Sequence, residues 1–401
     1  MTNEQIVEIL VKKGIITADA LAGAGKLNPK QADRFLDYVF DLSKLKNIAR
    51  MVKFSPESME IDRIGIGDRV AWPKALAKAP QVRQGVSHSK IALTPVEVIV
   101  PFEIGQVYKE INIEGDKVED HIVQLFAKQF NNNLEQMYIR ADTLGEAVLE
   151  GDLIDGGSTT GYIKDPLMAL ITGWLRRADA SNLVDNGGVN VSDSTFGAML
   201  RALPEKYKRD LDQMVFLAPS NLEQLYRERT GTRATPAGDE ARSSRGRLTP
   251  YGVTLDTIPL MQFYPTIVEH LTMPGGATPV SLRYNPVLAG SDVVTLQTLD
   301  LTPTLPYTGG GVDYTFDDVN GTITPAAALF GANVKVTYQA FPQVLLTVLN
   351  NLIVGIGRDI TVERARDIYS LTDQWVMHAK VAVQIENDEA IVKAHSIGDD
   401  I

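Results

Sequence analysis

The stretch that decides the fold is KVEDHIVQLFAKQFNNNLEQMYIRAD, residues 117–142. It predicts one long helix, because apolar side chains recur every three or four residues along it. At about 1.5 Å per residue, the helix would span about 39 Å, the width of a small domain. We expect it to support other elements, with His121 as a solvated or capping residue and no catalyst. The residues on the apolar face are Val118, Ile122, Leu125, Phe126, Phe130, Leu134, Met137, Tyr138 and Ala141.

Composition places the chain among folded proteins with two or three domains. It has 401 residues, of which 44% are hydrophobic and 22% charged. The absence of cysteine excludes disulfides, thiolate metal sites and cysteine nucleophiles. A formal charge of −11 argues against a dedicated nucleic-acid reader. No apolar run is long enough for a membrane span and the start lacks a basic leader, so we expect the protein to stay where it is made.

Residues 1–110 predict two extended parts. The segment 1–55 reads as a helical arm, with Asn28-Pro29 as a helix start. The segment 56–110 alternates like two strands and predicts an extended β-hairpin loop. Prolines at 95 and 101 place its second run at an exposed or irregular edge. Between the runs, residues 73–90 carry basic side chains and no acid, which predicts either a solvated tip or a contact with an acidic neighbour. These basic residues are Lys74, Lys78, Arg83 and Lys90.

Residues 151–274 read as a mixed domain of helices around a buried strand, QMVFLAPS. Helices are expected over DPLMALITGWLRRAD, SDSTFGAMLRALPEKYK and NLEQLYRERTG. The segment from 227 to 247 holds six arginines against three acids, which suggests a subunit contact, a plain loop or, less well, a phosphate-binding loop. The candidate contact residues there are Arg233, Arg242, Arg245 and Arg247.

The next stretch, 275–340, is rich in threonine and valine and predicts an inserted all-β module with two tight-turned hairpins. After it, residues 341–401 return to the style of the main body, with a closing strand at 376–385. The overall prediction is an α+β fold.

The known signatures of enzymatic or metal chemistry do not fit this sequence. GAGKL at 23–27 fails as a phosphate loop, because Ala20 stands where a glycine is needed and Leu27 where a serine or threonine is needed. GIGRD at 355–359 lacks the third glycine of a dinucleotide site. DDVNG at 317–321 lacks the alternating acids of a calcium loop. The five histidines are scattered, and no G-x-S-x-G elbow occurs. We therefore predict no catalytic residues, no cofactor, no metal and no enzyme activity.

The order of these parts resembles the major capsid proteins of tailed bacteriophages, which have the HK97-like fold. LNPKQADRFLDYVFDLSKLKNIARMVKF is similar to their N-terminal arm, and EDHIVQLFAKQFNNNLEQMYIRAD to their spine helix. FGAMLRALPEKYKRDLDQMVFLAPSNLEQLYRERTG looks like their axial domain. The resemblance implies a peripheral domain at 111–150 and 341–401 with its spine helix at 117–142, and an axial domain at 151–274.

The resemblance also implies a function and a set of partners. The chain would self-assemble into hexamers and pentamers, forming the icosahedral shell of a phage head around double-stranded DNA held non-specifically. A scaffolding protein, a portal and a decoration protein are the implied partners, and the virion is the implied location, after assembly in the host cytoplasm. No membrane is implied. Two alternatives stay open: an encapsulin-type nanocompartment shell, and a phage tail or decoration protein that binds through residues 275–340.

Overall fold

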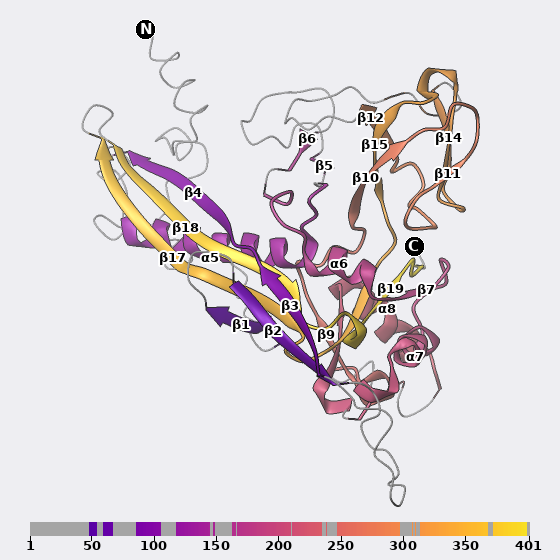
Figure 1. Ribbon diagram of the computed structural model, residues 1–401, viewed down its shortest axis with the longest axis horizontal. Coiled ribbons are helices and arrows are strands. Elements are labelled where there is room, and N and C mark those ends of the chain that lie inside the picture. Colours follow the sequence, from indigo (N-terminus) through magenta and orange to yellow (C-terminus); the bar gives the residue numbers. More distant parts are fainter. Residues whose placement is uncertain are drawn as a thin grey trace, which may run out of the picture.

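The computed structural model describes residues 48–53, 59–66, 86–105, 118–144, 147–148, 163–165, 167–209, 211–234, 238, 247–296, 307, 309, 313–367 and 372–398. Figure 1 shows an elongated sheet on one side, a mixed α/β part on the other, and a separate group of strands above the mixed part. All but residues 48–53 of the predicted arm at 1–55 lie outside the described residues.

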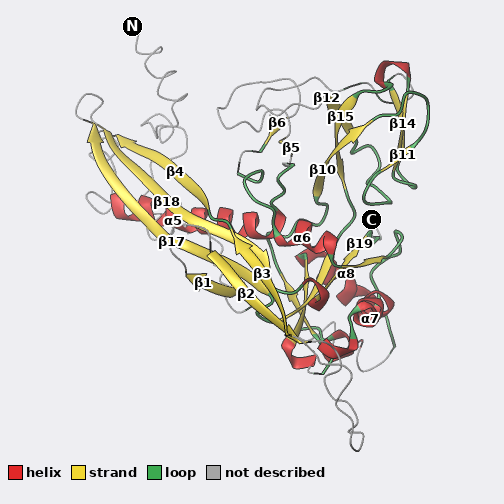
Figure 2. Ribbon diagram, in the orientation of Figure 1, coloured by secondary structure: helices red, strands yellow, loops and turns green. Residues whose placement is uncertain are grey.

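The elongated part is a four-stranded sheet with one long helix along it. The strand order is β1-β17-β18-β4, with β1 parallel to β17 and the other pairs antiparallel. The helix α5 lies across one face of this sheet (Figure 2), which confirms the long helix predicted from the sequence. The elements are β1 (Arg50–Lys53), β4 (Val96–Gly105), α5 (Val118–Arg140), β17 (Leu352–Asp367) and β18 (Thr372–Ile385).

The apolar face of α5 is buried against the sheet, as its periodicity predicts. Phe130 and Met137 on the helix are almost fully buried. Phe126 stacks on Phe102 of β4, with ring centroids 4.2 Å apart, and the ring of Trp375 on β18 lies parallel to Phe102 with a centroid distance of 6.1 Å. This contact joins a local helix pattern to strands that lie far away in the sequence.

A two-stranded antiparallel ribbon consists of β2 (Met59–Ile66) and β3 (Val86–Leu93). Its base is anchored because Leu93 is fully buried against Ile353 and Ala382 of the sheet. The ribbon confirms the predicted hairpin but is shorter than 56–110. The second alternating run breaks at Pro95, which cannot donate to a ladder, and continues as β4 inside the sheet. There β4 is an edge strand, as its prolines predict.

The mixed part is built on a five-stranded sheet, in the order β7-β19-β16-β8-β9. The predicted strand QMVFLAPS and helix NLEQLYRERTG are present as β8 and α8. Two strands of this sheet, β16 and β19, come from the segment 341–401, which the sequence analysis grouped with the spine helix. Both are almost wholly buried between β7 and β8. The elements are β7 (Asn182–Asp185), α7 (Asp193–Ala202), β8 (Met214–Ala218), α8 (Ser220–Gly231), β9 (Thr254–Thr257), β16 (Val344–Val348) and β19 (Ile391–His395).

The helix expected over DPLMALITGWLRRAD is mostly absent: only α6 (Trp174–Arg177) and the 3-10 turn Ala178–Ala180 form. Asp165 instead accepts the backbone N–H groups of Leu167 and Met168 and so holds a turn. Gly173 then approaches the end of α5 so closely that a Cβ would lie 2.9 Å from the nitrogen of Ala141. The backbone is therefore fixed by tertiary contact and not by helix propensity.

The helix expected over SDSTFGAMLRALPEKYK ends early, at Ala202, shortly before Pro204, which cannot continue it. Shorter elements complete this part: β5 (Ala147–Val148), β6 (Ile163–Lys164), and 3-10 turns at Glu205–Tyr207, Leu211–Gln213, Pro250–Gly252 and Asp388–Ala390.

The separate strands form two small sheets with a core of their own, and we call residues 265–340 the β module. It begins before the predicted 275, because β10 pairs along its whole length with β15. Of the two predicted hairpins, β13–β14 is confirmed, whereas β15 lies between β10 and β12. The elements are β10 (Thr266–Thr272), β11 (Val280–Ser281), β12 (Val293–Leu296), β13 (Tyr314–Asp317), β14 (Thr322–Pro325), β15 (Asn333–Gln339) and the 3-10 turn Ala327–Leu329. The wider division into peripheral and axial domains stays a prediction.

Candidate functional site

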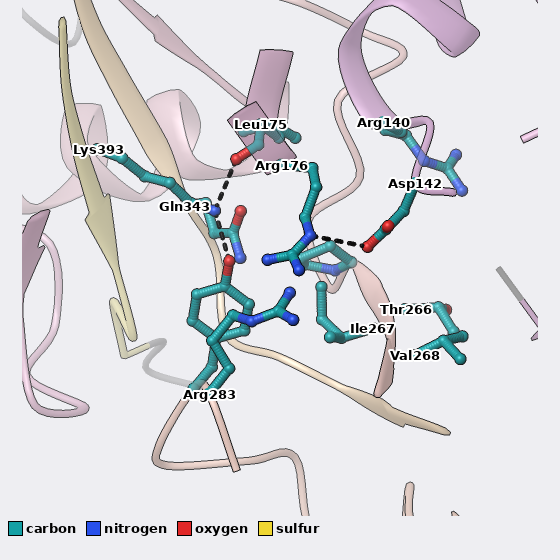
Figure 3. Close-up of a pocket in the computed structure, with 12 residues that line it drawn as sticks. Arg140, Asp142, Leu175, Arg176, Thr266, Ile267, Val268, Arg283, Gln343 and Lys393 are labelled. Atoms are coloured by element: carbon teal, nitrogen blue, oxygen red, sulfur yellow. Dashed lines mark hydrogen bonds and ion pairs between the residues drawn. The ribbon is translucent and has the colours of Figure 1, made fainter. Parts of the chain in front are cut away.

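The β module meets the rest of the chain at a cluster of charged side chains, which we call the junction. Its members are Arg176 and Asp179 after α5, Lys393 on β19, and Arg283 and Tyr284 from the β module. They surround or adjoin a cavity of about 30 Å³ (Figure 3). Charged groups are expensive to bury without partners, so the contacts of each one decide what the cluster can do.

Lys393 lies at the centre of the junction with its side chain 1% exposed. Its ammonium donates to the backbone oxygen of Leu175 at 3.0 Å, to Asp179 Oδ1 at 2.6 Å and to the hydroxyl of Tyr284 at 2.7 Å. Those three bonds use all three N–H groups of an ammonium. Burial lowers the pKa of Lys393, and the adjacent Asp179 opposes that shift. With every donor engaged and no exposed face, Lys393 is a structural clamp and not an accessible nucleophile.

Asp179 is the acceptor that joins the parts. Its Oδ1 accepts from Lys393 and from the Tyr284 hydroxyl at 2.6 Å, and its Oδ2 accepts from Arg176 at 2.8 Å. The guanidinium of Arg283 lies 3.6 Å from Oδ2. Burial opposes ionisation of this carboxyl, but the charge of Lys393 together with the hydrogen bonds from Lys393, Tyr284 and Arg176 outweighs burial and lowers the pKa of Asp179. One carboxylate therefore holds together α6, β19 and the β module.

Inside the β module a second carboxylate fixes the loop that carries Arg283 and Tyr284. Glu269 on β10 is buried, accepts the backbone N–H of Arg283 at 3.0 Å and accepts a short hydrogen bond from the Tyr338 hydroxyl. The Tyr338 oxygen also accepts the backbone N–H of Tyr284 at 3.4 Å. Burial, together with the charge of Glu269, raises the pKa of Tyr338 well above its usual value. The junction side chains of the module are thus oriented by its own core.

The junction can bind and orient groups, but it offers no set of groups for covalent or metal chemistry. No three His, Cys, Asp or Glu side chains of the described residues lie together as metal ligands. Within the same part of the chain, no helix is long and apolar enough to cross a membrane.

Three of the predicted contact residues are described, and each forms an ion pair outside the junction. Lys90 on the ribbon pairs with Glu60 at 2.6 Å, Arg233 after α8 pairs with Asp193 at 2.7 Å, and Arg247 pairs with Asp256 at 3.2 Å. All three side chains are about half or more exposed. The remaining candidates, Lys74, Lys78, Arg83, Arg242 and Arg245, lie outside the described residues. The role of the whole set stays a prediction.

The sequence analysis missed the junction. A signal existed in IVKAH at 391–395, where one lysine interrupts a run that is otherwise typical of a buried strand. Asp179, the partner of Lys393, follows the arginine pair 176–177. Tyr284 is more than 100 residues from both Asp179 and Lys393, so sequence spacing could not predict that the three side chains meet. Tyr284 Oη and Asp179 Oδ1, 105 residues apart, are 2.6 Å from each other.

Comparison with known proteins finds one relative in sequence and several similar folds. No family model matches the sequence. The chain is 26% identical over 266 residues to the "Putative prophage capsid protein YqbE" of Bacillus subtilis strain 168, which covers 66% of this chain and 78% of that protein.

Two solved capsid structures share the fold over nearly the whole chain. The capsid of a native GTA particle matches with a TM-score of 0.50 and 12% identity, over 96% of this chain and 99% of that one. The procapsid of satellite phage P4, which includes its size determination protein, matches with a TM-score of 0.50 and 10% identity, over 99% and 98%. These likenesses show that the chain is similar in sequence to a prophage capsid protein and has the HK97-like fold of the two solved capsids.

Proposed function

We propose that this chain is the structural subunit of an icosahedral phage head, assembling into hexamers and pentamers that enclose double-stranded DNA. The observation that carries the proposal is the match to a prophage capsid protein, combined with a fold whose parts extend away from one another. Among the described residues the ribbon β2–β3 pairs with no further strand, so its outer edges are unpaired, and such edges gain stability when a neighbour covers them.

The edge strand β4 supports the same proposal. Ile99 lies on the edge strand of the sheet with 59% of its surface exposed, although its neighbours Val98 and Phe102 are buried. A large apolar side chain beside an unpaired edge is a feature that assembly would cover. We therefore assign β4 and the ribbon β2–β3 to contacts between subunits.

Several narrower statements belong to the same proposal. The subunit has a structural role without enzyme activity or cofactor, and it resides in the virion after assembly in the host cytoplasm. A scaffolding protein and a portal are its expected partners, with a decoration protein as a further one. The basic residues Lys74, Lys78, Arg83 and Lys90 would contact an adjacent subunit, and Arg233, Arg242, Arg245 and Arg247 would meet around capsomer centres.

The direct test is to express the chain alone and image it by negative-stain electron microscopy beside sedimentation velocity. We expect closed shells or rings of five and six subunits. If only monomers form, the test is repeated with the products of the adjacent genes, one of which would be the scaffolding protein. A chain that stays monomeric in both cases contradicts the proposal.

A pair of substitutions sharpens this test. Ile99→Asp on β4 is expected to abolish assembly while leaving the melting temperature of the unassembled chain unchanged, because Ile99 is exposed there. Val319→Asp is the matched control. Val319 is 77% exposed at the β13–β14 turn, so this variant should assemble normally. Equal assembly by both variants would contradict the role of the β4 edge.

The two alternatives give different results in the same preparation. An encapsulin-type compartment would form shells that enclose a protein cargo when expressed with its neighbouring genes, and would hold no DNA. A binding module would stay small and attach to cells or glycans through the β module. Shells formed with a scaffolding protein, and filled with DNA in infected cells, support the phage head.

A further inference from the structure

The cavity at the junction carries more hydrogen-bond donors than the chain uses. Arg176 directs its Nε to Asp142 at 3.3 Å and one Nη to Asp179 at 2.8 Å. A guanidinium has five N–H groups, and the rest of those on Arg176 have no partner among the described residues. The guanidinium of Arg283 lies 3.6 Å from Asp179, which is too long for a hydrogen bond. Figure 3 shows both guanidinium groups beside the cavity.

Gln343 adds a donor that is fully enclosed. The residue is 2% exposed and lines the cavity, and its Nε2 has no hydrogen-bond partner in the described part of the chain. In Figure 3 its amide points toward the space beside Arg176 and Arg283. A buried amide without an acceptor costs about 1–3 kcal/mol, so an acceptor at this place would be stabilising.

Charged side chains of both signs line the cavity. Asp142 pairs with Arg176, and Asp179 pairs with Arg176 and Lys393. A hydrogen bond from a charged donor to an ionised acceptor is stronger than one to a neutral acceptor. The guanidinium groups of Arg176 and Arg283 therefore favour an anionic acceptor in the cavity.

The volume of the cavity limits the size of the ligand. The cavity of about 30 Å³ has room for about two water-sized atoms, at about 10–15 Å³ each. A carboxylate presents two acceptor oxygens in one plane, which matches two guanidinium groups and an amide. We propose that the cavity binds a carboxylate group, which accepts from Arg176, Arg283 and Gln343 and thereby fastens the β module to the body of the subunit.

The carboxylate could come from two sources with the same chemistry. One is a free small carboxylate, and the other is an aspartate or glutamate side chain of a second copy of this chain, which carries 50 such residues. The second source rests on the proposed function, since it needs a neighbour in a shell. The binding test below uses the unassembled chain, so its result does not depend on whether shells form.

The first measurement is the melting temperature of the unassembled chain in sodium formate, compared with sodium chloride at equal ionic strength and pH 7. A ligand that binds only the folded state raises the melting temperature progressively with its concentration. We expect formate to raise it above the chloride value in a concentration-dependent way. If the melting temperature is the same in both salts at every concentration, the proposal is wrong. That result is expected if the Gln343 amide oxygen itself accepts from Arg176, because no ligand is then needed.

Two variants locate the effect. Arg283→Gln removes one guanidinium and should abolish the formate-dependent rise. Gln343→Glu supplies the carboxylate covalently, and we expect it to melt at or above the wild-type temperature and to be insensitive to formate. Arg201→Gln, an exposed arginine on α7, is the matched control and should keep the full response. If Arg283→Gln fails to fold, Gln343→Glu still decides: an undiminished formate response in that variant contradicts the site.

Assembled shells distinguish the sources. If a neighbour supplies the carboxylate, formate raises the melting temperature of the unassembled chain only. If the ligand is free, the response persists in shells. Either result supports the site. If formate does not raise the melting temperature of the unassembled chain, the site is contradicted.

Discussion

The helix α5 and the β module are attached to the rest of the subunit by opposite kinds of contact. Along α5 the contact is apolar and aromatic, with Phe126 stacked on Phe102 and Met137 fully buried. At the β module the contact is a carboxylate surrounded by cations, with Asp179 bound by Lys393 and Tyr284. Apolar burial stabilises without regard to direction, whereas the charged contact depends on each partner being present and ionised. The two attachments should therefore respond differently to mutation and to acid.

The largest effect is expected for Asp179→Asn. This change leaves Lys393 charged and buried without its carboxylate, which costs about 3–5 kcal/mol when one partner of a buried pair is removed. The free energy of unfolding in urea measures the loss. The double variant Asp179→Asn with Lys393→Met should recover much of it, because the fully buried charge of Lys393 is then removed as well. Equal stability of the single and double variants would show that the pair is not coupled.

Met137→Ala tests the apolar attachment. Removing a fully buried methionine side chain costs about 2–5 kcal/mol, set by how far the site can collapse. The same urea titration measures it, and the loss should be independent of pH. Leu183→Ala, at a side chain that is 47% exposed, is the control and should leave the urea midpoint nearly unchanged. A pH-dependent loss for Met137→Ala would contradict the distinction between the two attachments.

Acid should weaken the charged attachment first. Lys393 lowers the pKa of Asp179 below the ordinary value of 3.8. A carboxyl with a lower pKa in the folded state contributes stability that is present above about pH 4, and that falls as pH drops through the folded pKa. Melting temperature recorded from pH 5 to pH 2 should therefore fall less steeply for Asp179→Asn than for wild type. Parallel curves would exclude Asp179 as the source of the acid sensitivity.

The smallest effect is expected on the ribbon. The Lys90–Glu60 pair is exposed on both sides, and exposed pairs contribute little because water screens them. Lys90→Gln should leave the melting temperature of the unassembled chain unchanged. Lys53→Gln on β1, also exposed, serves as the matched control. If Lys90 contacts a neighbour, as we propose, its variant should weaken assembly while the control assembles normally, and a stability loss without an assembly defect would reverse that assignment.

The sequence by itself determined the elements whose pattern is local. The three- and four-residue spacing gave α5 nearly to its ends, and alternation gave β2, β3, β13 and β14, because a periodic apolar face forms the same element wherever it is buried. The order of those elements was enough to suggest the capsid fold. The order of the elements could not predict the junction, because a local apolar pattern does not show which distant polar side chains contact one another.

Tertiary structure alone decided where the long-range pairs lie. It placed β10 in the β module through β15, and moved β16 and β19 into the five-stranded sheet. It also replaced most of a predicted helix by a turn at Asp165 and by the close packing of Gly173 on the end of α5. The junction belongs to the same class, because Asp179, Tyr284 and Lys393 become neighbours only after three separate parts have packed. Local propensity is weak against such contacts, so the fold could be predicted from the pattern and the site could not.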